Sequence, residues 1–219
     1  MSQPAPATVT AATRRPSKAR ERILATVDRL FYDEGIHAVG IQRIVAESDV
    51  TRVTLYRHFP SKDDLVSAYL EGRAAYDHRQ VDAIIETHPD DPRRALTELA
   101  AALTRDDFAV VQRGCPFINA SAEFSRSHPA RAHAREIRDW VTRRLEGLLQ
   151  RLEHRDPRAT AEQLMMVRTG AVVSRALDEN DHLNQDFLTC WEKLVDDGLI
   201  KAQRQSRSSR ARLPGRTQA

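Results

Sequence analysis

Apolar residues recur every three or four positions along most of the chain, which is the spacing of one face of an α-helix. The first such segment lies between Ser17 and Gly35. Serine is favourable just before a helix, and glycine in a left-handed conformation commonly follows one. We therefore predict a helix between these two residues. Its buried face carries Ile23, Val27, Leu30 and Phe31.

Two short helices are predicted next, over residues 41–47 and 52–59. Gly40 is an acceptable residue before the first of them. The turn that joins them, residues 48–50, has Asp49 at a position where positive φ is common. Aspartate tolerates positive φ better than most residues other than glycine, so it suits this turn.

The helix over residues 52–59 has a cap, a stop and two faces. Thr51 offers a hydroxyl that can accept from a free backbone amide one turn on, and Pro60 prevents the helix from continuing. Leu55 and Phe59 are four residues apart and can face a core, so, Val53 aside, the remaining side chains are polar and mostly outward. So short a helix is marginal in water alone. We interpret it as a recognition helix, braced from behind and facing a polyanion.

The rest of the chain is predicted to be long helices separated by breaks that contain proline or glycine. One helix covers residues 62–87, and a second ends near Arg105. A third opens at Pro129 and closes at Asp156-Pro157. The last two are expected over residues 159–177 and 185–201. The first of these two is apolar on more than one side, which is typical of a helix buried between partners.

Composition excludes some classes of protein but does not identify the function. The chain has 219 residues, a net charge of +3 and a pI of about 9.1, so the position of the basic residues matters more than their sum. Two cysteines and the lack of a long apolar run predict a cytoplasmic protein without a membrane segment. Scattered histidines and the absence of a phosphate loop or nucleophile elbow predict no metal, no cofactor and no enzymatic activity.

One stretch of sequence is specific. Ile44-Val45-Ala46, then Val50-Thr51, then the pattern Thr54-Leu55-Tyr56-x-His58-Phe59-x-x-Lys62, resembles the DNA-binding domain of TetR-type bacterial transcriptional regulators. The resemblance covers roughly residues 18–70. Two positions depart from it, because many relatives have threonine or serine at Gly40 and glycine at Asp49.

The resemblance implies an all-α chain with two domains. An N-terminal three-helix helix-turn-helix domain would occupy residues 17–62, after a disordered arm at residues 1–16. A C-terminal helical domain for ligand binding and dimerisation would occupy residues 63–203, before a basic disordered tail at residues 204–219. The last two helices would pair with those of a second subunit, because a two-fold operator needs two recognition helices one DNA turn apart.

The resemblance also implies which side chains meet DNA. Arg52 and Val53 occupy positions that approach base edges, and Gln42 matches a position that can also reach a base. Arginine suits guanine and glutamine suits adenine, while Tyr56 and Lys62 carry donors for phosphate oxygens. Tyr56 and His58 could instead only pack the three helices together. The predicted DNA-binding residues are Gln42, Thr51, Arg52, Val53, Thr54, Tyr56, Arg57, His58 and Lys62.

A cavity for a small-molecule effector is expected in the second domain. Its candidate walls are mostly aromatic or aliphatic, which suits a mostly apolar molecule, with Asn119 and Thr169 as polar anchors. For any one of these residues, packing in a filled core is the more common role. The complete candidate set is Tyr76, Leu103, Phe108, Phe117, Asn119, Phe124, Trp140, Met165, Thr169 and Val172.

Cys115 is a candidate sensing thiol. It lies in a Gly-Cys-Pro break that we expect to be exposed, and Arg113 two residues away could lower the pKa of its thiol. The leading hypothesis is a homodimeric repressor released from a palindromic double-stranded DNA operator by its effector. The alternative is a small-molecule or cysteine-based redox sensor that no longer reads DNA specifically.

Overall fold

The computed structural model describes residues 17–104, 113–177 and 181–199, and these are entirely helical apart from their connections. The predicted arm, the basic tail and Phe108 lie outside the described residues. The helices are α1 (Lys18–Glu34), α2 (Ile41–Glu47), α3 (Arg52–His58), α4 (Lys62–Thr87), α5 (Pro92–Thr104), α6 (Pro116–Glu123), α7 (Pro129–Arg151), α8 (Pro157–Leu177) and α9 (Leu183–Asp197). The all-α prediction is therefore confirmed. Among these helices, none is both long enough and apolar enough to cross a bilayer.

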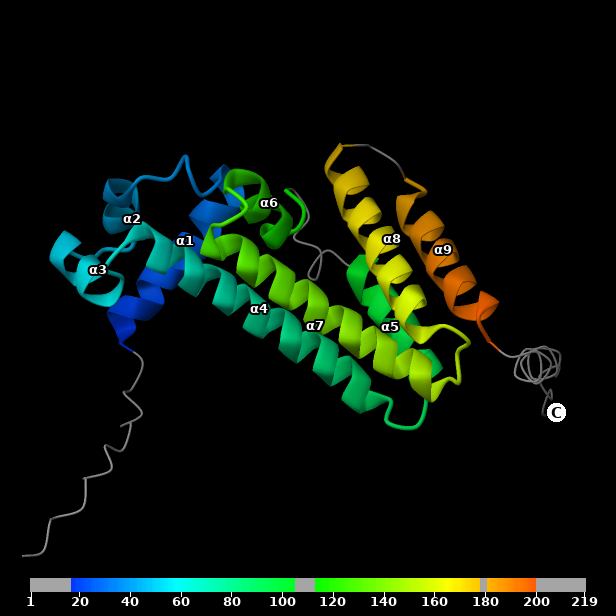
Figure 1. The fold of residues 1–219 in the computed structure, drawn as a ribbon. Coiled ribbons are helices and arrows are strands. Elements are labelled where there is room, and N and C mark those ends of the chain that lie inside the picture. Colours follow the sequence, from blue (N-terminus) through cyan, green and yellow to red (C-terminus); the bar gives the residue numbers. More distant parts are fainter. Residues whose placement is uncertain (1–16, 105–112, 178–180, 200–219) are drawn as a thin grey trace, which may run out of the picture.

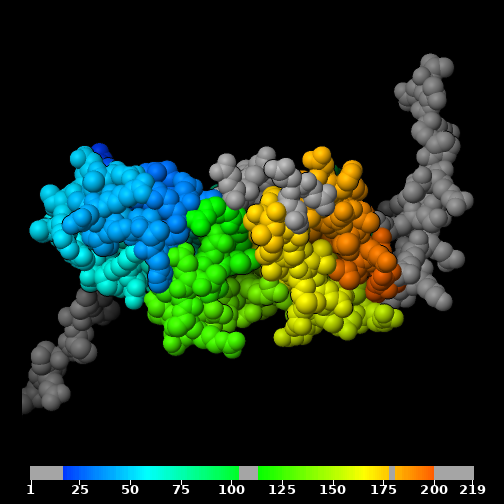
Figure 2. Space-filling view, turned by 90° about the horizontal axis from the view of Figure 1, so that it is seen from above, coloured from blue at the N-terminus to red at the C-terminus, as the bar shows by residue number. Residues whose placement is uncertain are grey.

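The helices form an elongated molecule with different elements at its two ends (Figure 1). Helices α1, α2 and α3 lie at one end, and α8 and α9 lie at the other. Helices α4 and α7 run side by side between them. The space-filling view shows the same separation, with the N-terminal helices and the α8–α9 pair at opposite ends (Figure 2). Helices α4 and α7 therefore span the distance between the two ends.

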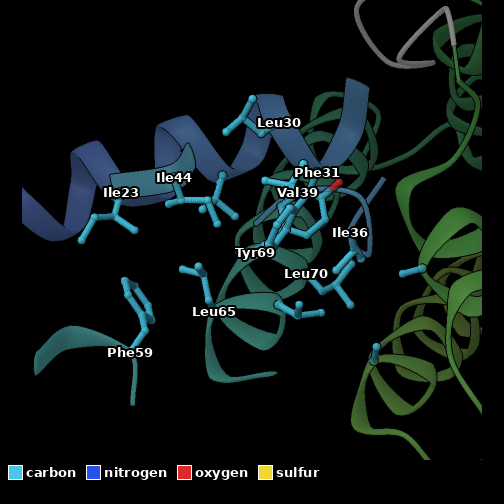
Figure 3. Close-up of a cluster of buried hydrophobic side chains, with 14 of the residues drawn as sticks. Ile23, Leu30, Phe31, Ile36, Val39, Ile44, Phe59, Leu65, Tyr69 and Leu70 are labelled. Carbon is cyan, nitrogen blue, oxygen red and sulfur yellow. The ribbon is translucent and has the colours of Figure 1, made fainter. Parts of the chain in front are cut away.

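The first hydrophobic core joins α1–α4 to α6 and the beginning of α7. Ile23, Leu30 and Ile44 are fully buried in it, and the rings of Phe31 and Tyr69 meet edge to face with centroids 5.6 Å apart (Figure 3). Phe117 and Ala120 of α6, along with Ile137 of α7, belong to the same core. The core of the helix-turn-helix thus extends past the boundary predicted after residue 62.

The second core lies between the end of α4 and helices α5, α7, α8 and α9. Trp191 of α9 is its largest fully buried side chain, and Leu145 and Leu164 pack there from α7 and α8. Burying side chains of this size contributes about 1.5–3 kcal/mol each. This core fixes the arrangement of the helices that surround the cavities described below.

The ends of the helices follow the local sequence with two exceptions. Helices α5, α6, α7 and α8 all begin with proline, whose fixed φ suits a first helical turn. Gly35 has a positive φ of 96°, but its ψ of 150° lies outside the left-handed helical region that we predicted. Ser17 precedes α1 without making a side-chain capping bond. At both positions a distant residue lies close by: the Glu123 carboxylate lies beside Gly35, and His58 Nε2 lies 3.3 Å from the Ser17 hydroxyl.

Candidate nucleic-acid interface and internal cavities

Helix α3 presents the outward polar face that its sequence predicts. Leu55 is fully buried, whereas 78% of Val53 and 37% of Tyr56 are exposed. Arg52 and Arg57 are also exposed, and the guanidinium carbon of Arg52 lies 5.6 Å from the centroid of the Tyr56 ring. These side chains share the solvent side of a helix that the first core holds from behind. A valine this exposed is free to contact a surface outside the chain.

The hydroxyl of Thr51 caps α3, as predicted. Thr51 Oγ1 accepts from the Thr54 amide at 3.1 Å and lies 2.9 Å from Thr54 Oγ1. His58 is half-buried, and its Nε2 lies 3.3 Å from the hydroxyl of Ser17. His58 therefore joins α3 to the start of α1, which explains why Ser17 does not cap its own helix. Asp49, with φ of 49°, makes the predicted turn before α3.

Lys62 holds the helix-turn-helix to α4. Its Nζ donates to the Val39 carbonyl at 2.7 Å and lies 5.9 Å from the centroid of the Phe31 ring. Burial lowers the pKa of its ammonium group. The capping box predicted at this helix start is present, because Ser61 Oγ accepts from the Asp64 amide at 3.1 Å and Asp64 accepts from the Ser61 amide. Two donors of the ammonium group remain for a phosphate.

The positive charge of this domain is unevenly matched by carboxylates. Gln42 is exposed on α2, but the neighbouring Arg43 is held in ion pairs, one of them to Glu47 at 2.7 Å. By contrast, Arg52 and Arg57 form no ion pair with any residue in the described ranges. Helix α3 therefore carries positive charge that no carboxylate of the described residues neutralises, as do Lys18 and Arg20 of α1, and a polyanion could approach it there.

Among the described residues, a hollow of about 460 Å³ lies between α4 and α7 and includes Trp140 in its lining. Two adjoining cavities lie elsewhere between the helices. The larger, about 510 Å³, is bounded by residues of α1, α4 and α8, and the smaller, about 270 Å³, by residues of α6, α7 and α8. Asp77, Cys115 and Arg168 line both, so the two spaces meet at these side chains. Six predicted residues lie at the cavities: Tyr76, Leu103 and Val172 at the larger, and Phe117, Met165 and Thr169 at the smaller.

Three predicted residues lie elsewhere. The side-chain amide of Asn119 donates to the Arg113 carbonyl at 2.7 Å. Phe124 stacks on His128 with ring centroids 3.9 Å apart, and Trp140 packs against His78 with centroids 4.0 Å apart. None of the three lines either cavity among the described residues. Their aromatic or amide character predicted ligand contact, but the structure uses it in contacts with other residues of the chain.

The larger cavity has a charged lining that was not predicted from the sequence. Arg73, Arg79, Arg168 and Arg175, together with Asp28 and Asp77, line it beside the apolar side chains. Burial raises the pKa of Asp77 to about 6, although the positive charges of Arg168 and Arg73 act in the opposite direction. The prediction of a mostly apolar lining is therefore incomplete. A charged residue on a long helix usually faces water, so the sequence alone gave no sign that these face a cavity.

Cys115 lies inside the molecule, and the prediction of an exposed thiol is wrong. Only 8% of the residue is accessible, because it packs into the first core at the start of α6. The guanidinium of Arg113 donates to the Tyr32 carbonyl at 3.4 Å, so it is committed to α1. Cys115 nevertheless lines both cavities, so a small molecule there would meet its side chain.

Helix α6 connects the cavities to the helix-turn-helix. At its start, the Tyr32 hydroxyl of α1 donates to the Gly114 carbonyl at 3.2 Å. At its end, the Glu123 carboxylate accepts from the backbone amides of Ile36 and His37, at 2.9 and 2.6 Å. A carboxylate that accepts two amide bonds is a strong local clamp. A shift of α6 would therefore be felt directly by the link between α1 and α2.

Known proteins with a similar sequence and fold identify the family of this chain. Residues 23–69 match the family model described as bacterial regulatory proteins, tetR family. A solved structure, SCO4454, a TetR-family transcriptional regulator from Streptomyces coelicolor, is 36% identical and has a TM-score of 0.74. The match covers 84% of this chain and 97% of that one. The chain belongs to the TetR family. The resemblance inferred from the motif around α3 is therefore confirmed.

Two further proteins are similar to this chain. The HTH-type transcriptional repressor BepR of Brucella suis is 24% identical over 177 residues, which is 74% of this chain and 81% of that one. The reduced form of NemR from E. coli shares the fold, with a TM-score of 0.70 at 20% identity over 80% of this chain and 96% of that one. The protein is thus a transcriptional regulator of a DNA-binding family and not an enzyme.

Proposed function

We propose that the protein is a homodimeric repressor that binds a palindromic operator through α3 and releases it when a small molecule occupies the cavities. The observation that carries this proposal is the outward face of α3, where Arg52, Val53 and Tyr56 are exposed over a rigid core. The similarity to the repressor BepR supports repression. Acting on the chromosome would place the protein in the bacterial cytoplasm.

The chemistry of α3 supports an assignment of roles at the operator. Arg52 can make two hydrogen bonds to a guanine, and Val53 can contact a thymine methyl group. Tyr56, Arg57 and Lys62 carry donors for phosphate oxygens. The hydroxyl of Thr51 and the ring of His58 are already used within the domain, so we assign them to positioning α3. Gln42 is exposed on α2 and could read an adenine, and Thr54 lies beside the α3 contacts.

Binding to a duplex that covers the region upstream of the protein's own gene tests this assignment. The wild type should prefer this duplex to a random one, with an affinity that falls steeply between about 50 and 200 mM salt. Arg52→Ala should cost about 1–3 kcal/mol on the preferred duplex and little on the random one. Arg57→Gln should weaken both duplexes and reduce the salt slope by about one.

Arg158→Ala is the matched control, because Arg158 is exposed on α8, at the opposite end of the molecule from α3. It should leave both affinities unchanged. Equal, weak binding of the wild type to both duplexes would instead favour the alternative, a sensor that no longer reads DNA specifically. The burial of Cys115 makes a sensor based on that thiol the weaker of the two hypotheses.

An apolar stripe on α8 supports dimerisation through the last two helices. Met166 is 60% exposed and Leu177 is 77% exposed, and Val173 lies between them along the same face. Gly170 also lies there with open space around its α-carbon, which would allow another backbone to approach closely. Isolated exposed apolar residues are ordinary, but a row of them on one helix indicates a surface that another subunit covers.

The contacts of α6 support a mechanism for release. A molecule in the cavities would touch Gly114 and Cys115 at the start of this helix, which Tyr32 ties to α1. Glu123 at its end holds the link before α2. If the bound molecule favours a different position of α6, it also favours a different spacing of the two recognition helices. Operator affinity then falls by the coupling free energy between the two sites.

A further inference from the structure

The side chains of Asp77 on α4 and Arg168 on α8 mark the place where the two cavities meet. Both line the 510 Å³ and the 270 Å³ spaces, and both also line a narrow gap that reaches the buried Trp191. Arg168 is half-buried. A charged side chain at the junction of two internal spaces is in a position to hold a molecule that occupies both.

The charges around the larger cavity are not balanced. Among the described residues, four arginines and two aspartates line it, which leaves two positive charges in excess. Arg73 is already paired with both oxygens of Asp28, at 2.5 and 2.8 Å, and the guanidinium of Arg175 donates to Asn184. Arg168 makes no hydrogen bond or ion pair within 4 Å with any residue in the described ranges, so its donors are available.

Asp77 does not remove this excess. It forms no ion pair with Arg168 in the described part of the chain, although the positive charge of Arg168 acts to lower the pKa of Asp77. Arg168 is half-buried, so its guanidinium has lost part of its hydration, and the oxygens of a bound anion would replace the lost hydrogen bonds. The other surroundings of the cavity are apolar or aromatic, among them Tyr76, Leu103 and Val172.

We propose that the effector is an organic anion, with its charged group bound by Arg168 and its apolar body lying against Tyr76, Leu103 and Val172. This rests on the proposed function of the cavities as the effector site. Guanidinium groups bind carboxylate, sulfonate or phosphate oxygens through two parallel hydrogen bonds, which gives both strength and orientation. An organic cation held by Asp77 is the opposite outcome, and the experiment below separates the two.

Two fluorescent probes that differ only in charge provide the test. 1-Anilinonaphthalene-8-sulfonate carries one sulfonate, and N-phenyl-1-naphthylamine has the same rings without it. The wild type should bind the sulfonate about tenfold more tightly, or better, as expected for hydrogen bonds to a charged group. Arg168→Met should abolish that preference while the neutral probe binds as before. Arg158→Gln, on the exposed side of the same helix, should change neither affinity.

Val172→Trp shows where the probes bind, since a large side chain at this position would fill the larger cavity. It should weaken both probes, whereas binding to the exposed stripe of α8 would be unaffected. Equal affinity for the two probes in the wild type, or no effect of Val172→Trp, would overturn the proposal. So would tighter binding of N-(1-naphthyl)ethylenediamine, a cationic relative of the probes, than of the sulfonate.

Operator binding, measured on the same samples without probe, keeps the two proposals apart. A protein that prefers the anionic probe but does not recognise its upstream duplex would contradict the proposed function alone. A protein that recognises the duplex but shows no preference for the anion would contradict the inference about the effector alone. Circular dichroism of each variant distinguishes a lost contact from a lost fold, and a folded Arg168→Met that retains the preference refutes the role of Arg168.

Discussion

Replacing Asp77 by asparagine should stabilise the folded protein at neutral pH and should lose that benefit in acid. The side chain lies between the helices, and burial raises the pKa of its carboxyl group from the ordinary 3.8 to about 6. Arg168 and Arg73 attract the ionised form, but their effect is smaller than that of burial. Asparagine has nearly the same shape without the charge, so it removes the cost of ionising this group inside the protein.

The magnitude follows from the difference between the two pKa values. A group with a pKa of 3.8 in the unfolded chain and about 6 in the folded one makes the ionised folded state costlier by about 3 kcal/mol. Asp77 is not fully enclosed, so water reduces this to about 1–3 kcal/mol. For a chain of this size, each kcal/mol shifts Tm by about 2–4 °C.

The sign of the pH dependence is fixed by proton binding. Between about pH 4 and pH 6 the folded state binds more protons at Asp77 than the unfolded state, so wild-type stability falls as pH rises through this range. The advantage of Asp77→Asn is therefore absent below about pH 4 and complete above about pH 7. Arg73, Arg168, Arg144 and Cys115 share the cavities with Asp77, and the first three stay charged throughout.

Urea unfolding of the wild type and Asp77→Asn at a series of pH values is the appropriate assay. The protein concentration must be held constant, because dimerisation makes apparent stability depend on it. The difference between the two midpoints should open as pH rises from about 4 to about 6 and should be constant above about pH 7. A variant that is no more stable than the wild type at neutral pH, or equally more stable at every pH, would refute the reasoning.

Three further changes test other parts of the structure. Glu123→Gln should lower the free energy of unfolding, measured in urea, by about 1–3 kcal/mol, because an amide cannot accept both backbone hydrogen bonds equally. It should also weaken the response of operator binding to a cavity ligand. An unchanged response would show that the Glu123 contacts do not couple the cavities to the operator site. Gly198→Ala should cost about 1–3 kcal/mol, since its new methyl group would lie 1.8 Å from the buried ring of His154, whereas Gly147→Ala has open space and should not destabilise. Val173→Asp should lower the sedimentation coefficient towards that of a monomer, because it places a charge in the apolar stripe on α8. A variant that remains a dimer would show that the stripe is not the dimer interface.

Local sequence predicted much of the fold because local interactions decide it. Helix α4 has the predicted bounds, since Ser61 and Asp64 cap its start and its apolar spacing continues to Thr87. The cap of α3 at Thr51 and the positive φ of Asp49 were also predictable, because each depends on residues no more than a few positions away. These features need no knowledge of which helices meet.

Contacts between distant segments were not predictable in the same way. The hydroxyl of Ser17 was expected to cap α1 but lies against His58, which is 41 residues later. Lys62 was expected to face phosphate, and nothing in the sequence indicates that its ammonium group also donates to the Val39 carbonyl, 23 residues earlier. The inward direction of Arg168 depends on how α8 packs against α4 and α7, and the spacing of apolar residues on one helix does not reveal it.

The sharing of one core by α6 and the first three helices affects how this regulator can be dissected. Phe117 and Ala120 fill space behind the DNA-binding helices, and Glu123 satisfies two backbone donors beside them. A fragment cut after residue 62 would expose that apolar surface and leave those amides to water. A chimera meant to transplant the operator specificity of this chain would have to include α6, or provide an equivalent support from the host protein.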